Sequence, residues 1–201
     1  MSEACCTPPP PSSDPSYRRI LWIALFANLA LFTVELVASV WSGSSALAAD
    51  AADFLGDSAN YALSLGAIAL GGAWVSRVAL LKGAAMSVYG IAVLAYAAWR
   101  AWLGVPPEPI TMGVVGALAL AVNFSVAALL YRFREGDANM RSVWLCTRND
   151  VIANVAVLVA AAGVFGTGTV WPDVAVAAML ALLGLSSGRI VIRQARAELN
   201  A

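Results

Sequence analysis

Residues 28–57 read NLALFTVELVASVWSGSSALAADAADFLGD, two apolar runs joined by a polar turn. The turn is the Ser-Gly-Ser-Ser segment at 42–45, and clusters of this composition separate helices. The second run contains the acids Asp50, Asp53 and Asp57. Acids at membrane depth are costly and persist mainly where they hold an ion or a proton. The stretch therefore predicts two membrane helices, the second of which carries functional side chains.

The rest of the chain repeats this apolar pattern. Of the 201 residues, 61% are hydrophobic and 12% are charged, and the mean hydropathy is +0.78; soluble domains carry about a quarter charged residues. Runs long enough to cross a hydrocarbon core of about 30 Å lie at 20–41, 47–73, 79–103, 110–131, 142–165 and 170–192. The sequence thus predicts an all-α membrane protein, a six-transmembrane-helix bundle.

The basic residues indicate how this bundle is oriented. Those that share one side of it are Arg18, Arg19, Arg77, Lys82, Arg132, Arg134, Arg141, Arg189, Arg193 and Arg196, and only Arg100 lies near the other side. Because Lys and Arg near helix ends favour the cytoplasmic side, both termini are expected to be cytoplasmic. We expect residues 1–19, with their run of prolines, to form a flexible cytoplasmic tail, and residues 20–199 to form the transmembrane domain.

The charge balance and residue usage exclude several functions. Lys and Arg total 12 and Asp and Glu total 12, so no global field recruits nucleic acid. Histidine is absent, which excludes any chemistry that needs an imidazole and limits a metal site to carboxylate, thiolate, amide, backbone and water ligands. The cysteines are Cys5, Cys6 and Cys146, an odd number that implies no disulfide framework.

The acids of the second span share one helix face. At about 100° per residue, Asp50, Asp53, Asp57 and Asn60 fall within an arc of about 80°. Like charges at i and i+4 repel each other, and a low dielectric strengthens the repulsion. Asp53 and Asp57 therefore need a cation or a shared proton between them, and a divalent metal ion meets that need.

The fifth span repeats the device, because Cys146, Asp150 and Asn154 also share one face. The two spans run in opposite directions, which brings Asp57 and Asp150 to similar depths near the midplane. Two other interpretations are that these acids only join helices or that Asp150 pairs with Arg148. Arg148 lies about 160° away around the helix and can snorkel to the interface, so it is a poor partner.

Other polar residues inside the spans have two interpretations. Asn28 and Glu35 on the first span and Asn123 on the fourth could line an ion path, or Asn28 and Asn123 could form interhelical hydrogen bonds, which we favour. Glu35 needs a proton or a partner. Asp50 lies near the outer interface and could be hydrated or cap a helix. Cys146 is either a ligand or an apolar filler.

These residues resemble a known family. The stretch at 28–57, with its asparagine, glutamate, SGS turn and AD followed by a second acid, resembles the first two helices of the cation diffusion facilitator family. Residues 123–154, with an EGDANMR loop and an NDVIAN helix face, resemble its fourth and fifth helices, and TGTVWPD at 167–173 resembles its last external turn.

The resemblance implies a function and a site. It implies a secondary active transporter, not an enzyme, that moves divalent cations out of the cytoplasm in exchange for protons, without a prosthetic group. Zinc is the most expected transported metal, followed by cadmium or cobalt. Manganese or iron is expected instead if the Cys146 thiol is not a ligand. The implied metal ligands are Asp53, Asp57, Cys146 and Asp150, with Asn154 beside them. The expected location is a bacterial inner (plasma) membrane.

The chain also departs from the family pattern. Cys146 stands where the family most often has histidine, which leaves selectivity open. The family's usual cytoplasmic metal-binding domain is missing, so we expect a short form whose homodimer would be made by the helices. The alternative function is a non-transporting membrane metal-binding sensor or scaffold. An intramembrane protease is disfavoured, because Phe54-Leu55-Gly56-Asp57 lacks the first glycine of a GxGD motif.

Overall fold

The computed structural model describes residues 15–70, 72–135 and 138–199, and every regular element in these ranges is helical. The helices are α1 (Pro15–Ser42), α2 (Ser45–Leu70), α3 (Gly72–Leu103), α4 (Pro109–Leu130), the short η2 (Tyr131–Phe133), α5 (Ala138–Thr167) and α6 (Trp171–Leu199). The predicted all-α bundle of six long helices is confirmed. The helix α1 begins within the tail expected at 1–19, because proline is well tolerated at a first helical position; residues 1–14 lie outside the described ranges.

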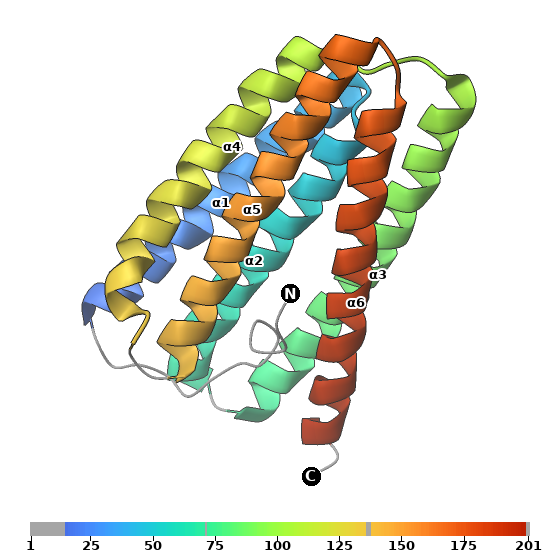
Figure 1. Cartoon of the computed structure of the whole chain (residues 1–201). Coiled ribbons are helices and arrows are strands. Elements are labelled where there is room, and N and C mark those ends of the chain that lie inside the picture. Colours follow the sequence, from blue (N-terminus) through green and yellow to red (C-terminus); the bar gives the residue numbers. More distant parts are fainter. Residues whose placement is uncertain (1–14, 71, 136–137, 200–201) are drawn as a thin grey trace.

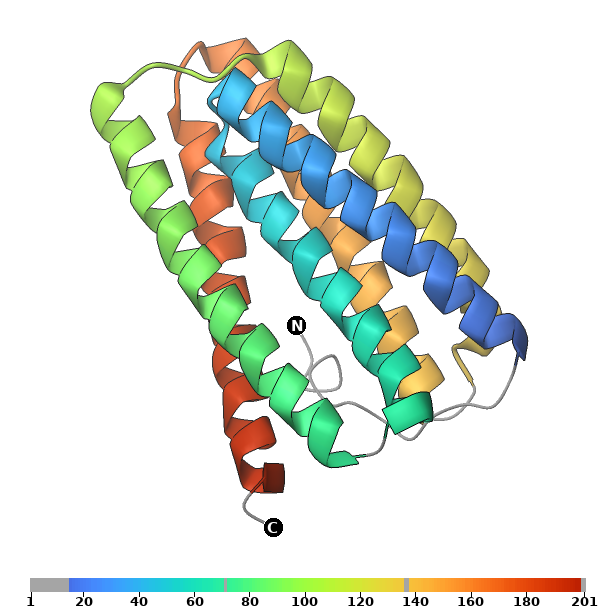
Figure 2. The ribbon, with the colours of Figure 1, turned by 180° about the vertical axis from the view of Figure 1, so that it is seen from behind.

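The six long helices alternate in direction along the bundle (Figure 1). The helices α1, α2, α4 and α5 form one group, and α3 packs chiefly along α6 beside it, as the opposite view also shows (Figure 2). The helix α2 contacts α1, α3, α5 and α6. It is therefore the central element, which contacts helices of its own group and also the α3–α6 pair.

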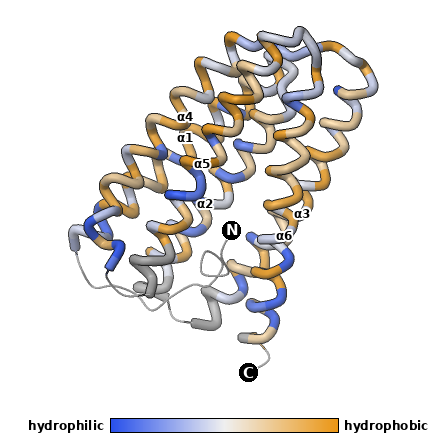
Figure 3. Tube along the Cα trace, in the orientation of Figure 1, coloured by the Kyte–Doolittle hydropathy of each residue, from blue (hydrophilic) through white to orange (hydrophobic). Residues whose placement is uncertain are grey.

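The outer surface of the bundle is apolar. Five helical segments are long and apolar enough to cross a membrane, and between 28% and 33% of each segment's most apolar window is buried within the bundle. Trp41 and Trp102 are each 88% exposed, and apolar residues cover most of the helices' length (Figure 3). Exposed apolar surface of this extent suits lipid. The chain is a multi-pass integral membrane protein.

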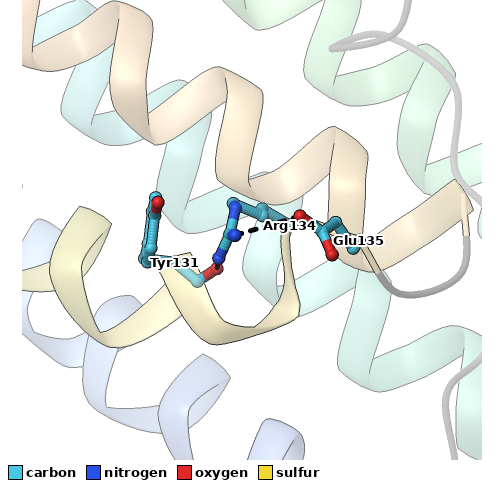
Figure 4. A network of polar contacts seen from close by, with 3 residues as sticks. All are labelled: Tyr131, Arg134 and Glu135. Atoms are coloured by element: carbon cyan, nitrogen blue, oxygen red, sulfur yellow. Dashed lines mark hydrogen bonds and ion pairs between the residues drawn. The ribbon is translucent and has the colours of Figure 1, made fainter.

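Hydrophilic residues gather at the end of the bundle where α1 starts and α6 ends (Figure 3), and Arg18, Arg19, Arg193 and Arg196 belong to these helix ends. In the connection after α4, the Arg134 guanidinium lies 3.9 Å from the centre of the Tyr131 ring. Arg134 also donates to the Tyr131 carbonyl at 3.2 Å and pairs with Glu135 at 2.9 Å (Figure 4). The positive-inside rule assigns this end to the cytoplasmic side.

The opposite end is held together by a buried acid. Asp173, in the first turn of α6, is 0% exposed. Its carboxylate accepts bonds from the Ser44 and Ser45 hydroxyls at 2.5 and 2.6 Å, and from the Ser45 and Ala46 amides at 2.8 and 3.1 Å. The first amides of a helix have no partner within the helix and attract negative charge. Asp173 thus caps α2 from a different helix and ties α6 to the α1–α2 turn.

A local cap starts α4 at the same end. Glu108 precedes the helix, and its carboxylate accepts from the Ile110 amide at 2.9 Å and the Thr111 amide at 2.6 Å. The bonds from Thr111, and then that from Ile110, lower the pKa of Glu108. The exposed carboxylate therefore stays charged and favours the positive end of the helix dipole.

Candidate metal site

A small cavity lies where α2, α3, α5 and α6 meet, and it contains all four side chains that the family resemblance implies as ligands. Its volume is about 30 Å³, and its lining consists of Asp53, Gly56, Asp57, Asn60, Lys82, Met86, Cys146, Asn149, Asp150, Ser187 and Val191. A space of this size holds roughly one or two water molecules. An ion in this space can be contacted directly by the side chains that line it.

The helix faces explain why these residues meet. Asp53, Asp57 and Asn60 recur at intervals of three and four on α2, and Cys146 and Asp150 are four apart on α5, so each set occupies one face. The two helices pack against each other, and the side chains of Asp57 and Asp150 line the same cavity. The expected meeting of these two acids across the bundle is present.

The four side chains share the cavity without converging on one point. Within the three described ranges, no three cysteine, aspartate or glutamate side chains stand close enough to hold one metal ion together. Coordination of an ion would therefore require side-chain rotations in the cavity. Asp57 is 8% exposed, and Asp53, Cys146 and Asp150 are partly exposed, so most of this adjustment falls on the three less buried groups.

Lys82 is a residue of the cavity that sequence reasoning missed. The sequence groups it with the basic residues of the cytoplasmic end, but it is 8% exposed and lines the acidic cavity. Its ammonium donates to the Asn60 amide oxygen. The available signal was its depth, since it lies about 15 Å along α3 from Gly72 at about 1.5 Å per residue.

A second polar cluster is separate from the cavity. The Asn154 amide donates to both carboxylate oxygens of Asp50, at 2.9 and 2.8 Å, and accepts from Asn123 at 3.1 Å. Asp50 is 1% exposed, so the cluster is buried where α2, α4 and α5 meet. Glu35 on α1 is also buried, at 0% exposed, and neither of its carboxyl oxygens has a hydrogen-bond partner among the described residues.

These contacts settle several expectations for the supporting residues. Asp50 is neither hydrated nor a helix cap, because neighbouring helices cover it completely. Asn154, expected beside Asp150, instead turns to Asp50. Asn123 makes the interhelical bond that we favoured, whereas the Asn28 amide donates to the Ala24 carbonyl of its own helix at 2.8 Å. Of these four residues, none lines the cavity.

An acidic cavity at the centre of a multi-pass helical bundle is typical of membrane proteins that bind or move ions. The chain matches the cation efflux transmembrane domain over residues 21–199, and it belongs to that family. The resemblance to the cation diffusion facilitators is thereby confirmed.

Characterised relatives are bacterial and longer than this chain. It is 28% identical over 189 residues to the metal cation efflux system protein CzcD of Cupriavidus metallidurans, an alignment that covers 87% of this chain and 59% of the relative. It is 29% identical over 178 residues to the cation efflux system protein CzcD of an Alcaligenes species, covering 82% and 56%.

A third relative is the cadmium, cobalt and zinc/H(+)-K(+) antiporter of Bacillus velezensis, 25% identical over 189 residues, with 86% of this chain and 60% of the relative covered. The chain thus spans between 56% and 60% of the length of these curated relatives. Their bacterial sources agree with a location in a bacterial plasma membrane.

Proposed function

We propose that the chain exports a divalent metal cation in exchange for protons, with zinc as the first substrate and cadmium or cobalt next. The observation that carries the proposal is that Asp53, Asp57, Cys146 and Asp150 line one cavity between α2 and α5. Membership of the cation efflux family supports the transported class. The name of the Bacillus velezensis relative, which pairs cadmium, cobalt and zinc with protons, supports the metals and the exchange.

The size and chemistry of the cavity suggest how the exchange works. The side-chain oxygens and the Cys146 sulfur that line the cavity replace water molecules of the ion when they bind it. Carboxylate and thiolate groups bind metal only when deprotonated, so an arriving ion displaces protons and returning protons displace the ion. Rocking of the helices around a site near the midplane would expose it to each side in turn.

Transport by the purified chain in proteoliposomes tests the proposal. We expect zinc uptake into vesicles to depend on an imposed pH gradient and to collapse when the gradient is dissipated, with cadmium and cobalt transported more slowly. Apparent metal affinity should rise with pH, because proton release accompanies binding. Tight zinc binding without transport under any gradient would instead identify a metal-binding sensor or scaffold.

Replacing Cys146 should change which metal is carried. With Cys146→Ser we expect about a tenfold loss of cadmium transport relative to zinc, because the softer ion depends more on sulfur. The measurement is the ratio of cadmium to zinc uptake in the same vesicle preparation. Cys146→Ala is the companion variant, since it removes every donor atom. If both variants keep the original ratio, Cys146 is an apolar filler and the site consists of carboxylates.

A further inference from the structure

Lys82 is the only lysine in the chain, and every other basic side chain is an arginine. Arginine carries a broad planar group with five donors, whereas lysine carries a compact charge on a flexible stem. The one compact cation is therefore also the one that points into the acidic cavity, where it is 8% exposed.

The surroundings of Lys82 are those of a bound cation. Asp53, Asp57 and Asp150 line the same cavity as Lys82, and a positive charge among acidic groups reduces the repulsion between them. The hydrogen bond to Asn60 holds the ammonium one helical turn from Asp57.

We infer that Lys82 is a tethered counter-ion for the metal site, which neutralises the acids before the metal arrives and is displaced when the metal binds. The inference rests on the proposed function of the cavity and adds that the Lys82 ammonium competes with the metal ion for the acids. A lysine ammonium and a divalent ion among the same acids repel each other, so the presence of one weakens the binding of the other. The flexible stem lets the ammonium withdraw.

Competition by a tethered charge has a consequence for turnover. An ion bound only by carboxylates and a thiolate would leave slowly, since release has to restore unpaired acids. The returning ammonium takes over those acids as the ion departs. Lys82 should therefore weaken equilibrium binding of the metal and speed its release.

Zinc binding to purified full-length variants in detergent tests the inference. We expect Lys82→Gln to bind zinc at least about tenfold more tightly than the unmodified protein, with a lower maximal transport rate in proteoliposomes. Lys82→Arg keeps the charge and should stay within about threefold of the unmodified affinity. The matched control is Arg77→Gln, which removes an equal charge from an exposed position on the same helix and should leave affinity unchanged.

The outcomes separate the two proposals. A lysine with only a structural role would give weaker binding after Lys82→Gln, and that result, or unchanged binding, overturns the inference while the proposed function stands. Absence of zinc binding in the unmodified protein would instead contradict the proposed function and the inference with it.

A measurement on the unmodified protein covers the case in which Lys82→Gln does not fold. Because the chain has one lysine, an amine-reactive reagent followed by mass spectrometry reports on Lys82 alone among the side chains. Saturating zinc should raise its modification rate at least about threefold relative to a reference lysine peptide in the same tube, as the side chain leaves the acids. An unchanged or slower rate overturns the inference.

Discussion

Asp57→Asn and Asp150→Asn should each reduce zinc transport at least about 100-fold. The two carboxyl groups line one cavity between α2 and α5, so each variant removes one of the charges that would hold the ion while keeping the volume of the side chain. Even partners outside the first layer of ligands change metal affinity by about 10–100-fold. The measurement is the initial rate of zinc uptake in proteoliposomes at a fixed pH gradient.

The control for lost charge is Glu135→Gln. Glu135 lies on the surface with its side chain 82% exposed and pairs with Arg134, so its loss removes the same charge far from the cavity and should leave the rate unchanged.

Thermal unfolding of the two cavity variants distinguishes a loss of transport from a loss of folding. Removing one of several crowded acids relieves repulsion, so the melting temperature should stay constant or rise. Transport near the unmodified rate in both cavity variants would exclude the cavity as the metal site.

Asp173→Ala should lower the free energy of unfolding by about 1–3 kcal/mol, the cost of leaving buried hydrogen-bond donors without their acceptor. The variant leaves two hydroxyls and two backbone amides at the start of α2 without their acceptor. Its melting temperature in detergent is the measurement. Asp173→Asn keeps one acceptor oxygen, so its melting temperature should lie between those of the unmodified protein and Asp173→Ala.

Glu108→Ala is the matched control for Asp173→Ala. It removes an exposed cap from α4, where water can replace the lost bonds, so the loss of stability should be clearly smaller. Equal melting temperatures for Asp173→Ala and the unmodified protein would mean that the α6-to-α2 cap contributes nothing to stability. Because α2 is a continuous helix, a loosened start would also disturb the positions of Asp53 and Asp57 further along it.

The sequence alone predicted the helices and the polar faces, because both are local properties. Apolar runs of membrane length determine the number of helices, and the approximate 100° step per residue determines that Asp53 and Asp57 share a face, as do Cys146 and Asp150. Alternating directions then place Asp57 and Asp150 at a common depth. The structure contains the six long helices and places these four side chains around one cavity, and the same motifs identified the family.

Only the tertiary structure decided which polar groups meet. The packing of α3 and α6 against α2 brings Lys82 into the acidic cavity and Asp173 onto the start of α2, and the rotation of α5 turns Asn154 to Asp50. Sequence spacing defines the direction of a side chain relative to its own helix axis. It does not define how that helix is rotated against its neighbours, because that rotation results from the fit of all the packed surfaces together.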